Sequence, residues 1–294
     1  MTAPRSVALV GLGLMGGSLA RDLAALEAPP RIVAWSQDAR DVDQAVAAGV
    51  VDEAAPDAAA AAGGGDIVVY AVPLGADLDL LDPHRAIWRA GAVVTDVVSL
   101  KAPLVARARE LGVSDRFVGG HPMAGGESSG FGASRAGLFR GARVWLADDT
   151  GSPAARDAVC ALWRAVEAEP AWIPAREHDR RMVWASHLPQ LLSNVLAAAV
   201  AAEGLHASDL GPGGQGMTRL AASSPDMWRD LLAASGPDLA SALYRAGGVL
   251  GEVAAALEAG RLDEVAALME RTRAWRREPP PAGASDDPRR TGSP

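Results

Sequence analysis

The chain is poor in cysteine and in aromatic residues, and each shortage excludes something. Cys160 is the single cysteine among 294 residues, so neither an internal disulfide nor a cage of thiolate ligands around a metal is available. A chain without disulfides is typical of a reducing compartment, so we expect a cytoplasmic protein. Aromatic residues make up only 4% of the chain, so the core must consist mainly of Ala, Val and Leu.

Lysine is nearly absent too, and the net charge is negative. Lys101 is the single lysine, and the formal net charge is −8 at pH 7. Because nucleic acids are polyanions, this charge predicts small-molecule partners rather than DNA or RNA. The longest apolar run, Leu188–Ala202, is too short to cross a membrane, and no apolar stretch has the form of an export signal.

The order of the apolar segments predicts two domains of different class. Short β-rich runs alternate with Ala-rich helical stretches up to about residue 175, which indicates βαβ units and a mainly parallel sheet. After Glu177 we find only helical patterns. We therefore predict an α/β Rossmann-type nucleotide-binding domain (residues 1–176), an all-α helical domain (177–276) and a flexible tail (277–294). The expected strands are Val7–Val10, Arg31–Trp35, Asp66–Val72, Ala92–Val97, Phe117–Gly119, Arg143–Ala147 and Ala171–Ile173, and the expected later helices are Leu188–Ala202, Pro225–Ala234, Asp238–Ala259 and Asp263–Trp275.

A glycine-rich turn follows the first expected strand. Gly11, Gly13 and Gly16 form a GxGxxG pattern before a helical stretch. In dinucleotide-binding folds the first glycine makes the tight turn, the second lets the backbone approach the pyrophosphate, and the third allows the helix to pack closely on the strand. The helix N-terminus then offers N–H groups and a partial positive charge to the phosphates. The pattern in this context predicts dinucleotide binding, with an ordinary glycine turn as the alternative.

The choice between NAD and NADP depends on the residues after the second strand, Arg31–Trp35. NAD enzymes usually place a carboxylate there, on the ribose 2′-hydroxyl. In this chain that position is Ser36, Asp38 lies two residues later, and Arg40 is able to meet a 2′-phosphate. The missing acid favours NADP, and NAD stays open. The expected cofactor-binding residues are Gly11, Gly13, Leu14, Met15, Gly16, Ser36, Arg40, Val72 and Pro73.

Four further clusters carry a resemblance to a known family. They are Asp96-Val-Val-Ser99-Leu-Lys101, Gly119-Gly-His121-Pro122-Met-Ala-Gly125-Gly-Glu127, Ser186-His187-Leu-Pro189, and Thr218-Arg219 with the later Pro225-Asp-Met-Trp228. Together with the glycine turn they resemble the prephenate/arogenate dehydrogenase family of tyrosine biosynthesis, over about residues 5–275. The resemblance implies that a ring hydroxyl of a cyclohexadiene is oxidised, hydride passes to NAD or NADP, and CO₂ is lost. It also implies a homodimer formed through the helical domain.

The resemblance implies a role for each cluster. His121 would be the base that accepts the hydroxyl proton, since a histidine can be neutral at pH 7. Ser99 would hydrogen-bond the reacting hydroxyl or the histidine, and Arg219 would pair with a substrate carboxylate. Each role has a structural alternative: a turn histidine, an N-cap serine for the helix that begins near Lys101, and a surface arginine.

Other residues match the family pattern less directly. Glu127 matches a family position that gates the substrate pocket, with a solvated loop carboxylate as the alternative. His187 matches a histidine near the nicotinamide and the substrate, or makes a structural hydrogen bond. His178-Asp179 also fits the family pattern, and we expect it to orient the junction between the domains. His84 and His206 have no such context.

Three departures from the family lie where the substrate would be recognised. Gln190 stands where a second histidine often contacts the substrate side chain, Gly216 where an aspartate is common, and Gly126 where a threonine is frequent. Gln190 is therefore an expected substrate-binding residue of changed chemistry. Prephenate, arogenate and 4-amino-4-deoxyprephenate, which carries a ring amine, stay open as substrates.

Other functional classes fit the sequence less well. The β-hydroxyacid dehydrogenases use a catalytic lysine in their helical domain, whereas Lys101 lies in the nucleotide-binding half. A non-catalytic dinucleotide-sensing protein would be favoured if His121 or Arg219 were missing, and both are present. The five histidines show no HxxxH or HxxEH spacing, so we expect no metal site.

Overall fold

The computed structural model describes residues 4–126 and 128–278. By contacts the chain divides into two compact units, Met1–Gly236 and Pro237–Pro294. Every strand of the described residues belongs to the first unit. The expected tail lies almost wholly outside the described residues, because only 277 and 278 of it are included.

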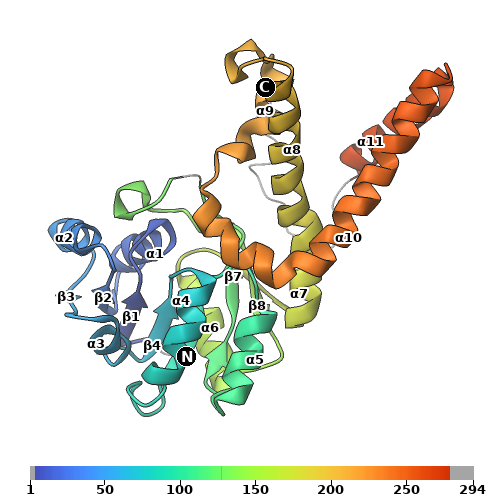
Figure 1. Ribbon diagram of the computed structural model, residues 1–294. Coiled ribbons are helices and arrows are strands. Elements are labelled where there is room, and N and C mark those ends of the chain that lie inside the picture. Colours follow the sequence, from blue (N-terminus) through green and yellow to red (C-terminus); the bar gives the residue numbers. More distant parts are fainter. Residues whose placement is uncertain (1–3, 127, 279–294) are drawn as a thin grey trace. The chain divides into compact units, whose positions relative to one another are not determined.

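A six-stranded parallel sheet forms the centre of the first unit. Its order is β3-β2-β1-β4-β5-β6, and Figure 1 labels β3, β2, β1 and β4 in this order. β2 and β3 follow on one side of β1, and β4, β5 and β6 follow in turn on its other side. The strand order therefore reverses between β1 and β4. Ligands of such sheets bind outside the carboxyl ends of the strands at this switch point. The strands are β1 (Ser6–Val10), β2 (Arg31–Trp35), β3 (Glu53–Ala54), β4 (Ile67–Tyr70), β5 (Val93–Asp96) and β6 (Phe117–Val118).

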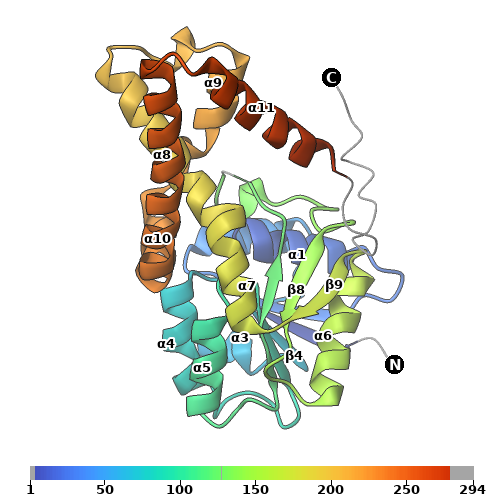
Figure 2. The same ribbon diagram turned by 90° about the vertical axis from the view of Figure 1, so that its right-hand side faces the viewer.

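Helices cover both faces of this sheet, which explains why its strands read as continuous apolar runs. Val7 and Leu9 of β1 belong to one buried cluster, and Ala8 and Val10 belong to another. α1, α2 and α6 contribute to the first cluster, and α3, α4 and α5 to the second, so the two sets lie on opposite faces (Figure 2). The helices are α1 (Leu14–Ala24), α2 (Ala39–Ala47), α3 (Ala58–Ala62), α4 (Leu74–His84), α5 (Ala102–Glu110) and α6 (Pro153–Ala165).

Three strands form a second sheet. β7 (Gly120–Pro122) pairs antiparallel with β8 (Arg143–Ala147), which pairs parallel with β9 (Glu169–Ile173). The sequence did not predict β3 or β7, because they have only two and three residues and β7 contains a glycine and a proline. β7 is the strand that carries His121 into the structure.

After Ile173 the described residues form helices only. In the first unit these are α7 (Ala175–Met182), a π-helical segment η2 (Val183–His187), α8 (Leu188–Ala202), η3 (Ala207–Asp209), α9 (Pro212–Thr218) and η4 (Arg219–Ala222). The change from strands to helices confirms the predicted fold class. None of the helices in the described part of the chain is both long and apolar enough to cross a membrane.

One long helix replaces two expected ones. α10 runs from Pro225 to Glu258 and continues through Pro237, where the sequence predicted a break. Proline at this position removes one hydrogen bond of the helix but leaves the turns on either side able to form. The boundary between the two compact units falls at the same proline. The second unit contains the remainder of α10 and α11 (Leu262–Arg277).

Candidate active site

The glycine turn has the geometry that a pyrophosphate requires. Gly11 has a φ of +104°, and a Cβ there would lie 2.4 Å from the Ala71 carbonyl oxygen. A Cβ at Gly16 would lie 2.0 Å from the Gly11 carbonyl oxygen, so Gly16 allows α1 to pack against the turn. A Cβ at Gly13 would meet nothing within 4 Å. The backbone at Gly13 is therefore open on the side where α1 begins, and the residues present fit a dinucleotide.

A cavity of about 630 Å³ lies at the ends of β1, β2 and β4. Of the expected cofactor-binding residues, six line it and three do not: Leu14, Met15 and Gly16 instead form the first turn of α1. The residues that line the cavity are Gly11, Leu12, Gly13, Ser36, Gln37, Asp38, Ala39, Arg40, Asp41, Ala71, Val72, Pro73 and Ser129. Three segments of the chain, residues 11–13, 36–41 and 71–73, thus meet at the switch point of the sheet, together with Ser129.

Arg40 is already paired with a carboxylate. Its Nη2 lies 2.6 Å from Asp38 Oδ2, and its Nε donates to both oxygens of the same carboxylate at 3.0 and 3.1 Å. Both side chains are exposed. These hydrogen bonds lower the pKa of Asp38, so the acid is ionised at neutral pH. The preference for NADP inferred from Arg40 is not confirmed by this arrangement.

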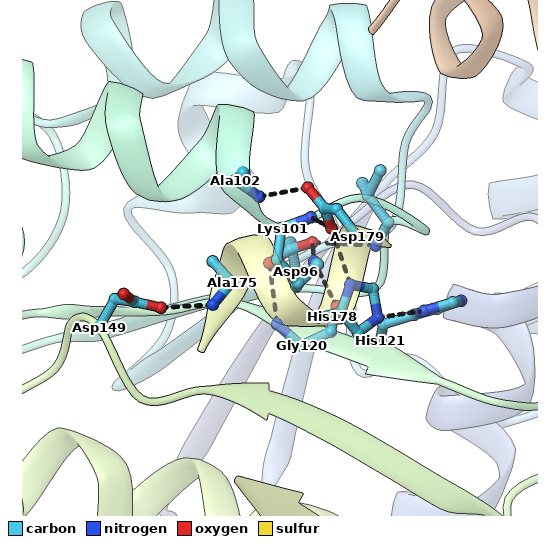
Figure 3. A network of polar contacts seen from close by, with 10 residues as sticks. Asp96, Lys101, Ala102, Gly120, His121, Asp149, Ala175, His178 and Asp179 are labelled. Carbon is cyan, nitrogen blue, oxygen red and sulfur yellow. Dashed lines mark hydrogen bonds and ion pairs between the residues drawn. The ribbon is translucent and has the colours of Figure 1, made fainter. Parts of the chain in front are cut away.

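His121 lies at the end of a chain of three side chains (Figure 3). Its Nδ1 is 2.9 Å from Nε2 of His178, and Nδ1 of His178 is 2.8 Å from Oδ1 of Asp179. The two imidazole rings meet edge to face, with their centroids 5.1 Å apart. Both histidines are buried, with exposures of 9% and 0%. The expected orienting pair His178-Asp179 therefore contacts the expected base directly.

The donors and acceptors fix which nitrogen of His121 carries the proton. An ionised carboxylate only accepts hydrogen bonds, so Nδ1 of His178 donates to Asp179. Neutral His178 then has a bare Nε2, which accepts from Nδ1–H of His121. In neutral His121 the remaining nitrogen, Nε2, must therefore carry a lone pair. The arrangement leaves one strong proton acceptor on this ring.

Burial keeps the histidines neutral. It lowers the pKa of His121 well below its ordinary value, and repulsion from a protonated His178, from the Lys101 ammonium and from a protonated His187 acts in the same direction. Burial also lowers the pKa of His178, although the hydrogen bond to Asp179 opposes this. At neutral pH both rings are uncharged, as the tautomer argument requires.

Asp179 also caps a helix in a distant part of the sequence. Its Oδ1 accepts from the backbone N–H of Lys101 at 2.7 Å, and its Oδ2 accepts from the N–H of Ala102 at 2.8 Å. The N-terminus of α5 is thus satisfied by α7 rather than by Ser99, which the sequence offered as a cap. The N-cap position of α5 is occupied by Lys101, so Ser99 is not the N-cap of this helix.

A buried ion pair holds the residue before His121. The Lys101 ammonium contacts the Asp96 carboxylate, and both side chains have an exposure of 0%. Lys101 Nζ also donates to the Gly120 carbonyl at 2.5 Å, and Asp96 Oδ1 accepts from the Gly120 N–H at 3.0 Å. Burial raises the pKa of Asp96, which Lys101 and the N–H groups of Gly120 and Val98 oppose. The Lys101–Asp96 pair therefore forms hydrogen bonds with both the carbonyl and the N–H of Gly120.

A second buried acid, Asp77, interacts electrostatically with Asp96 and Lys101. Asp77, in the first turn of α4, is completely buried, and neither carboxyl oxygen has a hydrogen-bond partner among the described residues. Burial and the charge of Asp96 raise the pKa of Asp77 well above its ordinary value. Both influences favour the protonated form of the Asp77 carboxyl group.

His187 has no polar partner in the part of the chain that the structure describes. It is buried, with an exposure of 1%, and neither ring nitrogen is hydrogen-bonded. The indole N–H of Trp228 is also without a partner there, and the two rings meet edge to face with centroids 5.7 Å apart. His187 ends the π-helical segment η2, a feature often found at functional sites. Unsatisfied nitrogens of this kind are typical of a site that a ligand completes.

Gln190 is engaged with the protein itself. Its Nε2 donates to Leu220 O at 2.7 Å and to Asn194 Oδ1 at 2.9 Å, and its Oε1 accepts from Ser223 Oγ at 3.4 Å. The amide thus joins α8 to η4, the segment that begins with Arg219. The hydrogen bond to η4 goes to the residue after Arg219, and Arg219 is itself exposed. Glu127, the expected gate residue, lies outside the described residues.

Comparison with known proteins identifies the family. The profile described as "Prephenate dehydrogenase, nucleotide-binding domain" matches residues 19–170, and that described as "Prephenate dehydrogenase, dimerization domain" matches residues 174–271. The chain belongs to the prephenate dehydrogenase family. The resemblance inferred from the sequence clusters is therefore confirmed.

Individual members of the family cover most of this chain. The sequence is 33% identical over 244 residues to a prephenate dehydrogenase of Bacillus subtilis (77% of this chain, 63% of that protein) and 30% identical over 236 residues to one of Lactococcus lactis (78% and 64%). The chain thus spans less than two thirds of the length of either protein. A crystal structure of prephenate dehydrogenase from A. aeolicus, in complex with hydroxyphenyl propionate and NAD⁺, has a TM-score of 0.86 at 25% identity, covering 94% of this chain and 98% of that one.

Both family regions of this prephenate dehydrogenase family member contribute to the histidine cluster. Asp96, Lys101 and His121 lie in the first matched region, and His178 and Asp179 in the second. The sequence did not assign a role to Asp96, Lys101 or Asp77. A charged pair five residues apart beside a run of Val and Leu was the available signal, because such charges are buried only in pairs. No group of three or more potential metal ligands is found among the described residues.

Proposed function

We propose that the protein oxidises a cyclohexadiene carboxylate with a nicotinamide dinucleotide, releasing CO₂ and an aromatic product. The observation that carries the proposal is the Asp179–His178–His121 chain, which presents a bare Nε2 on a buried neutral histidine. The names of the relatives and the open glycine turn support the same conclusion.

His121 supplies the acid–base part of this reaction. The bound dinucleotide supplies an acceptor for the hydride that leaves C4 of the ring. As the hydride leaves, Nε2 of His121 accepts the proton of the C4 hydroxyl, which becomes a carbonyl. The bond between C1 and its carboxylate then breaks, CO₂ departs, and the electron pair makes the ring aromatic. The C4 oxygen regains a proton from His121, so the residue is restored.

Asp179 and His178 stabilise the charge that this transfer creates. When His121 becomes an imidazolium, its Nδ1–H continues to donate to His178, and the carboxylate of Asp179 lies behind it. The arrangement resembles the acid–histidine pair of serine hydrolases, in which the acid fixes the tautomer and stabilises the imidazolium. Here a second histidine is inserted between acid and base.

Arg219 and His187 are the residues we assign to substrate recognition. The guanidinium of Arg219 matches a ring or side-chain carboxylate, and Gln190 holds the segment that carries it. His187 and Trp228 offer nitrogens that lack partners within the described residues, so they would donate to or accept from the substrate. Ser99 would hydrogen-bond the reacting hydroxyl. Arg219→Ala is expected to raise KM for the cyclohexadiene by at least about tenfold with a smaller change in kcat.

An activity screen tests the proposal. The purified protein is assayed with prephenate, arogenate and 4-amino-4-deoxyprephenate, each with NAD and with NADP, by the absorbance of the reduced nicotinamide and by release of CO₂. Turnover of at least one substrate with both signals in equal amounts is the expected result. A reduced nicotinamide signal without CO₂ release, or no turnover of any of the three, would contradict it.

The helical part is proposed to form a homodimer. Within the second unit Tyr244, Leu250, Leu262, Met269 and Trp275 are exposed by between 62% and 83%. Exposed apolar side chains of this size support an interface with another copy of the chain, because large exposed apolar surfaces mark protein–protein contacts. Light scattering on the full chain is expected to give twice the mass of 30.2 kDa, and the monomer mass would overturn this assignment. We place the enzyme in the cytoplasm, where the buried thiol of Cys160 stays reduced.

A further inference from the structure

The end of β2 lacks the acid that binds an NAD ribose, but another acid lies within hydrogen-bond distance of Ser36. Asp41 lies in the first turn of α2 and lines the cavity together with Ser36. Ser36 Oγ donates to Asp41 Oδ2 at 3.3 Å. α2 thus places a carboxylate beside Ser36, the position at which the end of β2 supplies one in most NAD enzymes.

A second contact fixes this carboxylate. The backbone N–H of Phe131 donates to Asp41 Oδ1 at 2.7 Å. Phe131 begins the 3₁₀ turn Phe131–Ala133, on the loop that follows His121. With one donor on each oxygen, the carboxylate has a defined orientation and still has lone pairs for a further donor. A ribose hydroxyl is such a donor.

The other charges at this end of the cavity do not offset Asp41. Asp38 also lines the cavity, and Arg40 is held by Asp38 through three hydrogen bonds. The two acids and the single arginine leave one negative charge in excess. A 2′-phosphate brought here would be repelled, whereas a 2′-hydroxyl would not.

We propose that Asp41 selects NAD over NADP, taking the part of the acid that is missing at Ser36. This inference rests on the proposed function, because it requires a nicotinamide dinucleotide in this cavity. It reverses the preference that the sequence alone suggested, since the sequence shows the absence at residue 36 but not the return of a side chain from residue 41.

The test measures binding rather than turnover. Calorimetric titrations with NADH and with NADPH, without any cyclohexadiene, are run on the wild type and on Asp41→Asn. The asparagine oxygen still accepts from the Phe131 N–H, so this variant removes the charge and retains the loop contact. We expect the wild type to bind NADH at least about tenfold more tightly than NADPH, and Asp41→Asn to narrow that ratio by about tenfold, mainly through tighter NADPH.

Two further variants complete the design. Asp43→Asn removes the same charge from an exposed position on the same helix and is expected to leave the ratio unchanged. Ser36→Asp combined with Asp41→Asn returns the acid to the strand and is expected to restore the preference for NADH. If Asp41→Asn binds both dinucleotides weakly because it folds poorly, the NADH/NADPH ratio of the double variant still tests whether a carboxylate at this place sets the preference.

The outcomes separate this inference from the proposed function. A wild type that prefers NADPH, or an unchanged ratio in a folded Asp41→Asn, would overturn the inference and leave the proposed reaction intact. Failure of both dinucleotides to bind would overturn both. Selective NADH binding by a protein that turns over none of the three cyclohexadienes would support the inference and contradict the proposed reaction.

Discussion

The cavity at the end of β2 and the cluster around His121 lie in one unit but are built differently. The cavity takes its charged side chains from one stretch, residues 36–41, and the pair Asp38–Arg40 is exposed. The His121 cluster takes its side chains from β5, the residue before α5, β7 and α7, and Asp96, Lys101 and His178 have an exposure of 0%. Charges in the cavity act on a ligand through solvent, whereas those in the cluster act on each other through a dry interior. Substitutions should therefore change selectivity in the first region, and catalysis or stability in the second.

The largest expected effect is the loss of the base. His121→Asn removes the nitrogen that accepts the proton, so kcat should fall by roughly 10²–10⁴. Binding of the reduced dinucleotide should be unaffected, because His121 does not line the cavity at β2. The measurement is steady-state turnover together with a dinucleotide titration. His206→Asn, at an exposed histidine, is the matched control. Near wild-type turnover in His121→Asn would show that another group is the base.

Removing the buried lysine should mainly affect stability. Lys101→Met leaves the Asp96 carboxylate buried without its partner, which should lower the free energy of unfolding by about 3–5 kcal/mol. Arg140→Met breaks the exposed pair with Glu167 and should cost no more than about 1 kcal/mol. Urea denaturation of both variants measures the difference. Equal shifts of the two midpoints would mean that Lys101 and Asp96 gain little from each other.

Asp179→Asn should reverse the proton arrangement and also remove one of the two hydrogen bonds that cap α5. An amide N–H facing His178 would reverse the donor and acceptor order along the chain, which places a proton on Nε2 of His121. We expect kcat to fall by at least about tenfold with KM little changed. Asp149→Asn is a matched control, because Asp149 accepts from the N–H of Ala175 at the start of α7 without touching a histidine (Figure 3). Equal losses in the two variants would assign Asp179 a capping role alone.

The smallest effect concerns the acid side of the pH profile. A histidine base works when neutral, and burial lowers the pKa of His121, so kcat should hold below about pH 6.5 and fall only at lower pH. As the pH falls, the histidines of the unfolded chain are protonated at a higher pH than the buried histidines of the folded protein. Stability is therefore also lost as the pH falls below about 6.5. Circular dichroism at each pH separates the two effects. A decline of kcat centred at or above about pH 6.5, in the folded protein, would contradict the buried-base assignment.

Local patterns predicted much of this molecule. The apolar runs predicted β2 and the Leu188–Ala202 helix with their observed bounds, because burial on both faces or along one stripe leaves a continuous signal. Val7–Val10 missed only the first residue of β1. The glycine turn was visible because each glycine answers a steric need of its own backbone.

Contacts between distant segments were not predictable in this way. The cap on α5 comes from Asp179, 78 residues further along the chain, and Gln190 meets Leu220, 30 residues away. In a single sequence, neither residue of such a pair indicates which distant residue it contacts. The sequence indicated His121 as the base, but its tautomer depends on a hydrogen bond to His178 that only the fold creates.

Asp77 has a consequence for the calorimetry of folding. Burial and the charge of Asp96 raise the pKa of Asp77 in the folded protein, whereas in the unfolded chain it ionises at its ordinary value. Between these two values folding takes up a proton from the solution, so the contribution of Asp77 to stability declines as the pH rises. The buffer supplies this proton, so the heat of ionisation of the buffer is added to the measured enthalpy. Unfolding enthalpies of this protein in buffers of different ionisation heat should therefore differ, although the protein and its contacts are the same.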